Sequence, residues 1–120
     1  MCLDTVYRSK PKKSGYMWKA FTRHVNGDLR PVCVFRPVVA FGTWLLAVEQ
    51  SICGYDGPEY TSGFHGFISK EQAEHHWTAA VPRTVLIKVR YRGGHTWGLD
   101  ETCCTIVAKE IYVPKPRRGR

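Results

Sequence analysis

The clearest pattern of hydrophobic and polar positions lies in the middle of the chain, directly after Ser69. Ser69 followed by Gln72 is a capping-box pattern, in which the hydroxyl accepts from the Gln72 N–H and the Gln72 side chain reaches back. A helix is therefore expected to begin at Lys70 and to end before Pro82, which cannot continue the hydrogen-bond ladder. Its buried face is predicted at positions three and four apart: Ala73, His76, Trp77 and Ala80.

Strand patterns flank this helix. The apolar segment Gly-Phe-His-Gly-Phe occupies residues 63–67 before it, and residues 85–91 alternate apolar and mostly charged positions after it. An alternation with a period of two is typical of a half-buried strand. The centre of the chain is therefore predicted to run strand, helix, strand.

A hairpin is expected in the first third of the chain. Residues 16–24 read as a strand, and Asn26-Gly27 is a pair that tolerates the positive φ angles of a tight type I′ turn. Residues 29–35 supply the returning strand. Pro31 is expected at its start or outer edge, because proline has no N–H for the ladder.

The remaining segments complete the prediction. Residues 43–48 form a short apolar strand or buried segment, residues 49–62 a long loop, residues 93–98 a turn or bulged connection, and residues 105–113 a final strand. We therefore expect an α+β fold: a small mixed or antiparallel sheet of about five or six strands, with an Asn-Gly hairpin and one short helix packed on it.

Charge divides the chain into a body and two ends. The net charge is +8, of which residues 1–30 carry +5, residues 109–120 carry +4 and the middle −1. We expect a basic flexible lead over 1–15, one domain over 16–113 and a basic disordered tail over 114–120. Such ends favour polyanions such as nucleic acid or an acidic face of a host protein, although solubilising tails have the same composition.

Composition also excludes some classes of protein. No apolar run approaches the roughly 18 residues of a membrane span, and the N-terminus has no apolar signal region, so a cytoplasmic protein is expected. The five cysteines show no C-x-x-C spacing, and Cys103 and Cys104 would point to opposite faces of a strand. We therefore expect reduced thiols and no metal site.

Candidate chemistry is sparse. His65, among small neighbours, suits an acid, a base or a ligand contact, or a structural hydrogen bond to a loop carbonyl beneath the long segment 49–62. Cys2 follows the initiator Met and would become an N-terminal nucleophile if the Met were removed, or is an ordinary cysteine in a mobile end. No decisive catalytic motif accompanies either residue.

Cations and aromatic residues interleave in one region. Arg90, Tyr91, Arg92, His95 and Trp97 have the composition that binders of single-stranded nucleic acid use, and also that of a solvated strand face. Together with the basic ends they define a predicted binding set: Lys10, Lys12, Lys13, Arg90, Arg92, His95, Trp97, Arg117 and Arg118.

The layout resembles a family of small, mostly uncharacterised phage and bacterial proteins. The shared features are Met1-Cys2-Leu3, a Lys/Pro-rich lead, an aromatic-Lys strand and the Gly-Phe-His-x-Phe motif at 63–67. The resemblance implies a bacteriophage origin, action in the cytoplasm of a bacterial host, and binding to a host machine such as a defence nuclease complex.

A more distant resemblance is to the ADP-ribosyltransferase-like fold. It rests on residues 63–67, the helix containing Ala73 and the strand from Thr84. It implies NAD as cofactor and a catalytic Glu at Glu101 or Glu110, with Arg23 or His24 on the first strand. His65 and Phe67 replace the Tyr and Ser/Thr usual in that family.

These observations favour a non-enzymatic, basic accessory protein that uses no cofactor. It would bind a host nucleoprotein or nucleic acid, for example as an anti-CRISPR or similar inhibitor of host defence. The alternatives are a small NAD-dependent ADP-ribosyltransferase and an enzyme with Cys2 as nucleophile. Candidate catalytic residues are thus His65, Cys2 and Glu110.

Overall fold

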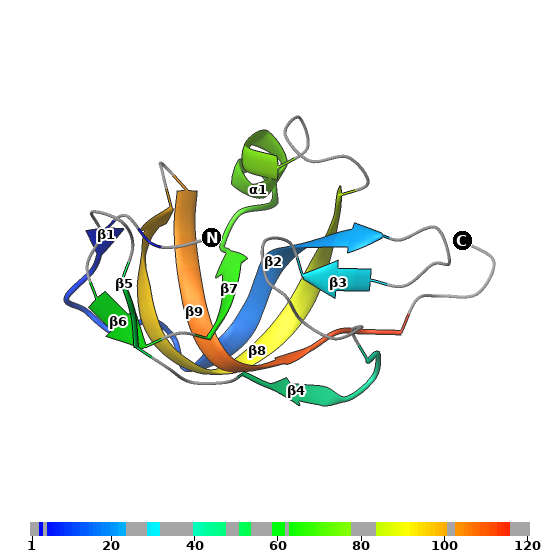
Figure 1. Cartoon of the computed structure of the whole chain (residues 1–120), viewed down its shortest axis with the longest axis horizontal. Coiled ribbons are helices and arrows are strands. Elements are labelled where there is room, and N and C mark those ends of the chain that lie inside the picture. The colour runs from blue at the N-terminus through cyan, green and yellow to red at the C-terminus, as the bar shows by residue number, and fades with distance from the viewer. Residues whose placement is uncertain are drawn as a thin grey trace.

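A computed structural model describes residues 3, 5–23, 29–31, 40–47, 51–53, 59–61, 63–77, 84–100 and 103–115. Strands dominate this part of the chain, and a single short helix interrupts them (Figure 1). In chain order the elements are β1 (Thr5–Val6), β2 (Ser14–Arg23), β3 (Leu29–Pro31), β4 (Trp44–Leu46), β5 (Ser51–Cys53), β6 (Glu59–Thr61), β7 (Phe64–Phe67), α1 (Lys70–Trp77), β8 (Thr84–Asp100) and β9 (Cys103–Tyr112).

The long strand β8 organises the main sheet. Its first half pairs antiparallel with β2, from Thr84 to Arg92, and its second half pairs antiparallel with β9, up to Asp100. Because β7 also pairs with both β2 and β9, the strands β8, β2, β7 and β9 form a closed circuit of hydrogen bonds. Figure 1 shows the resulting curvature, with β8 and β9 sweeping around the molecule.

Glycine-rich sequence lets β8 change partners. The register between β8 and β9 shifts between Gly94 and Thr96, as it does at a β-bulge, and bulges bend the strand that carries them. A Cβ atom on Gly94 would collide with the backbone carbonyl of Lys12, so only glycine allows the N-terminal segment to cross here. The predicted turn or bulged connection at 93–98 is thus a bulge inside a continuous strand.

The larger core fills the inside of this curve. Met17 and Phe21 of β2 lie on the same face as their cross-strand neighbours Val89 and Val85. The side chains that share this core are Met17, Phe21, Leu29, Ala47, Phe64, Val89, Tyr91, Ile106, Ala108, Ile111 and Val113.

A smaller core lies between the sheet and the helix. Ala20, Phe67 and Cys103 face Ala73 of α1. The helix begins at Lys70 as predicted, and the Gln72 N–H donates to the Ser69 hydroxyl at 3.4 Å. The reciprocal half of the capping box is wrong, because the Gln72 side-chain oxygen accepts instead from the Cys104 N–H at 3.2 Å and ties the helix to β9.

The predicted hairpin pairing is confirmed in the described residues. Arg23 pairs with Leu29, and Phe21 with Pro31, which ends β3. The Asn26-Gly27 turn lies outside the described residues. Segment 43–48 contains β4, but its side chains are less buried than the apolar sequence suggests, and Leu46 is 73% exposed.

Two expectations need correction. Segment 49–62 is not only loop, because it contains β5 and β6, which pair antiparallel to each other as a second small sheet. The fold is sheet-dominated and nearly all-β rather than clearly α+β, because α1 contributes only eight residues. The predicted antiparallel sheet with one short packed helix is otherwise present.

The N-terminal segment lies along β8. The strand β1 pairs antiparallel with its far end, Thr5 opposite Leu99, and Leu3 is buried. Further along, the Gly94 N–H donates to the Lys13 carbonyl at 2.9 Å. Within the described ranges, α1 is far too short and polar to cross a membrane.

Candidate functional site

Cations and aromatic rings share one face of the sheet. Lys88, Arg90 and Arg92 alternate along β8, so their side chains project from the same side at a spacing of roughly 7 Å. Arg90 has a tyrosine as cross-strand partner on each side of β8: Tyr16 of β2 on one side and Tyr112 of β9 on the other. With Trp44 of β4, they form a surface that we call the cation–aromatic face: Tyr16, Trp44, Lys88, Arg90, Arg92 and Tyr112.

Each cation of this face contacts a ring. The Arg92 guanidinium lies 4.0 Å from the centroid of the Trp44 ring, and that of Arg90 lies 5.5 Å from the same ring. The Lys88 ammonium lies 4.9 Å from the Tyr16 ring. Such contacts contribute roughly 0.5–1 kcal/mol each at exposed sites, so they orient the side chains without removing them from solvent.

Glu110 is the acidic neighbour of the face. Its carboxylate accepts from Arg92 Nε at 2.6 Å and from Nη2 at 3.0 Å, a bidentate arrangement. The hydrogen bonds to Arg92 lower the pKa of Glu110, and the same contact raises the pKa of Arg92. Glu110 is therefore ionised at neutral pH and neutralises one of the three cations.

A small cavity opens among these side chains. It has a volume of about 300 Å³. The residues that line it are Ser14, Gly15, Tyr16, Trp44, Arg90, Tyr91 and Arg92.

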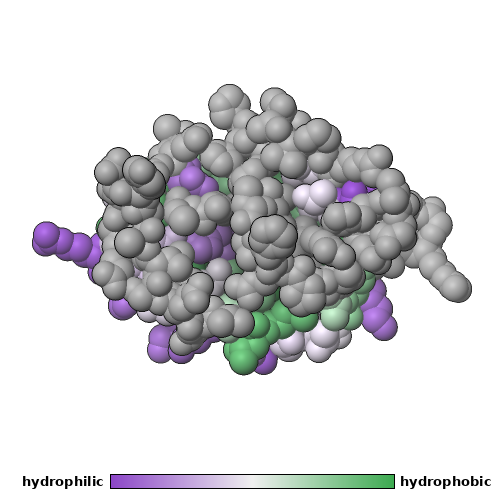
Figure 2. Space-filling view, in the orientation of Figure 1, coloured by the Kyte–Doolittle hydropathy of each residue, from purple (hydrophilic) through white to green (hydrophobic). Residues whose placement is uncertain are grey.

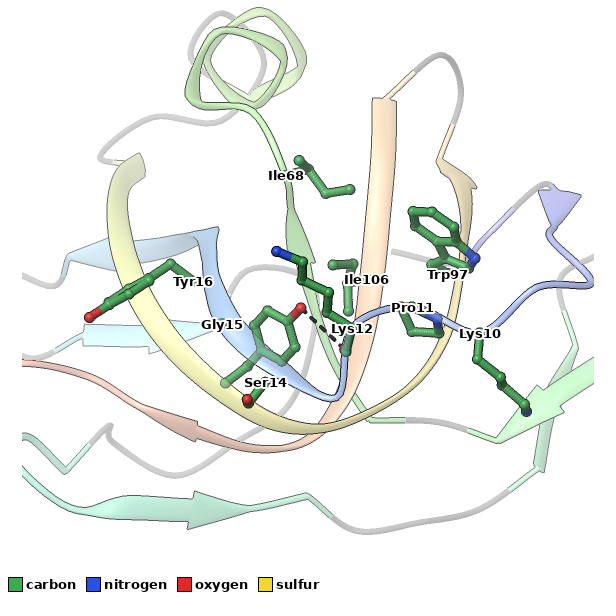
Figure 3. Close-up of a pocket in the computed structure, with 10 residues that line it drawn as sticks. Lys10, Pro11, Lys12, Ser14, Gly15, Tyr16, Ile68, Trp97 and Ile106 are labelled. Carbon is green, nitrogen blue, oxygen red and sulfur yellow. Dashed lines mark hydrogen bonds between the residues drawn. The ribbon is translucent and has the colours of Figure 1, made fainter.

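A larger cavity of about 540 Å³ lies beside it, where the N-terminal segment crosses the curved sheet (Figure 3). Figure 3 shows the Lys12 side chain extending across the opening between Tyr16 and Trp97, while the Lys10 side chain points away. Four residues, Ser14, Gly15, Tyr16 and Tyr91, line both cavities. The remaining lining residues of the larger cavity are Lys10, Pro11, Lys12, Ile68, Trp97 and Ile106.

Hydrogen bonds hold the walls of the larger cavity. The Tyr91 hydroxyl donates to the Lys12 carbonyl at 3.3 Å, and burial raises the pKa of Tyr91, so the phenol stays protonated. The Trp97 indole N–H donates to the Ser9 carbonyl at 2.9 Å. The centroids of the Trp97 and Tyr7 rings lie 5.3 Å apart, and the two rings are nearly perpendicular. These two hydrogen bonds fix the orientation of the Tyr91 and Trp97 rings in the cavity wall.

His65, the leading candidate from the sequence, lies elsewhere. The Leu3 N–H donates to the Tyr60 hydroxyl at 2.8 Å, and that hydroxyl lies 2.8 Å from His65 Nε2. His65 Nδ1 lies 3.1 Å from the Gly63 carbonyl, which can only accept, so Nδ1 carries the proton of a neutral ring. Tyr60 then donates to Nε2, and the hydrogen-bonding capacity of the imidazole is used.

Electrostatics keep this imidazole neutral. Burial, and then the charge of Lys19, lower the pKa of His65 from 6.5 to about 3. Lys19 itself is buried and donates to the His65 carbonyl at 2.9 Å. His65 lines neither of the two cavities, and its geometry matches the structural alternative.

Other predicted residues fall into three groups. Lys10, Lys12 and Lys13 are exposed, and Lys10 Nζ reaches the His95 carbonyl at 3.5 Å. Cys103 is buried beneath α1, where its thiol lies 3.6 Å from the Gln72 carbonyl, and Cys104 is half-buried on the other face of β9. Several candidates lie outside the described residues: Cys2, His24, Glu101, Arg117 and Arg118.

No metal centre is found in the described part of the chain, where no three His, Cys, Asp or Glu side chains lie close enough together to hold an ion.

Sequence reasoning missed three aromatic members of the face. Tyr16 was assigned to a strand, but its position opposite Arg90 depends on the β2–β8 register. The ring centroids of Trp44 and Tyr112 lie 5.7 Å apart because β4 pairs with β9.

Figure 2 shows a hydrophobic area at the lower edge of the molecule, where Figure 1 places β4.

Comparisons with known proteins give no further guide to the site. Protein-family models, curated proteins and solved structures were compared with this chain, and none of them matches it.

Proposed function

We propose that this protein is a non-enzymatic binder of single-stranded nucleic acid, free or within a nucleoprotein, and that the cation–aromatic face makes the contact. Arginine and lysine neutralise backbone phosphates, and exposed rings stack on bases. The face supplies both kinds of side chain on adjacent strands.

The observation that carries the proposal is the order of Lys88, Arg90 and Arg92 along one side of β8, each beside a ring. Tyr16 is 61% exposed, which leaves much of its surface open to a base. Glu110 neutralises only Arg92 through the contacts described above. Exposed Lys12 and Lys13 add positive charge where the N-terminal segment crosses β8.

The proposed wider role combines this chemistry with the resemblance to small phage proteins. A small basic protein that occupies the nucleic-acid path of a host nucleoprotein blocks that complex without any catalytic step. Inhibition of a host defence complex, as by an anti-CRISPR protein of phage origin, is thus our proposal for its biological use, with the bacterial cytoplasm as the site of action.

The test is direct binding to a labelled single-stranded oligonucleotide, followed by fluorescence anisotropy. We expect binding that weakens steeply between about 50 and 200 mM salt, because counterions are released when phosphates are neutralised. A duplex of the same sequence serves as comparison. Absence of binding at low salt to either form, and to a nucleoprotein, would contradict the proposal.

A further inference from the structure

The larger cavity adds a specific contact to the proposed function, on which this inference depends. We propose that the cavity receives one unstacked nucleobase of the bound strand, with the phosphate of that nucleotide held by Lys12 at the opening. A base has an apolar ring face and carries an anionic phosphate a short distance away, and the cavity offers the complement of both.

The walls fit the ring. Pro11, Ile68 and Ile106 supply aliphatic surface, and Tyr91 and Trp97 supply aromatic surface. Because the Trp97 N–H and the Tyr91 hydroxyl already donate to backbone carbonyls, these side chains offer mainly ring surface to a guest. Such a site binds by stacking and apolar contact, which is tolerant of base identity.

The opening of the larger cavity suits the negative charge of a phosphate. Lys12 extends across it in Figure 3 and is exposed. No carboxylate lines the cavity among the residues given above. An anionic group at the entrance is therefore favoured over a cationic or neutral one.

The size and position fit one nucleotide of a longer strand. A volume of about 540 Å³ is within the range of small-molecule sites, roughly 300–1,000 Å³. Tyr16 lines this cavity and also belongs to the cation–aromatic face, so a strand that follows the face passes the opening. A duplex keeps its bases stacked and would have to unpair one, which disfavours it.

The experiment uses a single-stranded oligonucleotide of about six nucleotides with one central 2-aminopurine. Acrylamide quenching of the 2-aminopurine emission measures how far the base is shielded from solvent. We expect the bound base to be quenched severalfold less efficiently than the free one. The variant Ile68→Trp narrows the mouth and is expected to abolish this protection and to weaken binding roughly tenfold.

The control variant is Thr61→Trp, an equally large addition at an exposed residue of β6 that lines neither cavity. It should leave protection and affinity unchanged. Salt-dependent binding of the strand without any protection of the base would overturn this inference and leave the proposed function intact. Absence of strand binding altogether would overturn both.

Discussion

Two regions of this molecule use the same residue types in opposite ways. Around His65, a histidine, a tyrosine and a lysine are buried and satisfy one another and the backbone. On the cation–aromatic face, Tyr16, Arg90 and Arg92 also contact their neighbours but remain exposed to solvent. Close packing of polar groups therefore does not identify a site by itself.

The difference lies in what a ligand would have to displace. At His65 a ligand would have to break hydrogen bonds in a buried place, where an unpaired polar group costs about 1–3 kcal/mol. On the face a phosphate competes with water and with weak ring contacts, and at Arg92 also with the Glu110 carboxylate. The first region holds the N-terminal segment in place, and the second keeps its cationic side chains exposed to solvent.

The largest expected effect concerns the pH dependence of stability. The pKa of His65 is about 3 in the folded state and 6.5 in the unfolded reference. Below pH 6.5 the unfolded chain binds a proton that the folded one excludes, so this contribution is full above 6.5 and is lost as the pH falls toward 3. The free energy of unfolding should fall by about 1.4 kcal/mol per pH unit, on the order of 4 kcal/mol by about pH 3.5.

Urea unfolding at several pH values measures this slope, and the variant His65→Gln provides the control, because it cannot titrate. Subtracting its slope removes the contribution of the acidic residues. If the two slopes agree, His65 is not the neutral, buried group described above, and the contrast between the regions weakens.

The next effect concerns the hydroxyl that joins the N-terminal segment to His65. Tyr60→Phe leaves the Leu3 N–H and His65 Nε2 without their partner, so the free energy of unfolding should fall by about 1–3 kcal/mol. Tyr16→Phe removes the same hydroxyl from an exposed ring and should change the free energy of unfolding little. Thermal or urea unfolding of the two variants measures the difference. Equal losses of stability would contradict the buried hydrogen bonds assigned to the Tyr60 hydroxyl.

A third prediction tests the face. Arg90→Gln should weaken binding of single-stranded nucleic acid roughly fivefold and reduce the slope of log affinity against log salt by about 0.7–1, because one phosphate contact is lost. Anisotropy titrations at several salt concentrations measure both. Arg23→Gln is the matched control: Arg23 ends β2, about seven residues or roughly 23 Å from Tyr16, the cross-strand partner of Arg90. Equal losses in both variants would indicate a nonspecific charge effect.

The smallest effect is expected at Glu110. Glu110→Gln breaks an exposed ion pair, so stability should change little, while nucleic-acid affinity should rise modestly because Arg92 is released. The alternative function, a NAD-dependent ADP-ribosyltransferase, is tested by calorimetry of NAD binding and turnover with the unmodified protein and with Glu110→Gln. NAD turnover that Glu110→Gln abolishes would instead support the ADP-ribosyltransferase hypothesis.

Local sequence signals predicted the elements well. The Ser69 cap, the alternation over 85–91 and the strand of 16–24 correspond to α1, β8 and β2, because each depends on neighbours a few residues away. Gly66 is explained only by the packing: a Cβ atom there would fall 2.5 Å from Met17 Cγ. The motif at 63–67 therefore reflects core packing as well as strand formation.

The candidate site was only half predictable. The alternation of Arg90 and Arg92 placed them on one face, and Tyr91 on the other, from the sequence alone. Their aromatic partners come from β2, β4 and β9, and a register shift of one residue would have moved each ring to the opposite face. The sequence could not show that His65 would be buried, because Leu3, whose N–H donates to the Tyr60 hydroxyl beside His65, comes from a distant part of the chain.

The division of β8 between two partners also has a consequence for how the chain folds. Ser14 pairs with Arg92, about 78 residues later in the sequence, so the pairing of β2 with β8 has high contact order. Such topologies fold slowly, commonly in milliseconds to seconds. During synthesis β2 can pair with β8 only after β8 has left the ribosome, so the apolar face of β2 stays uncovered by β8 until then.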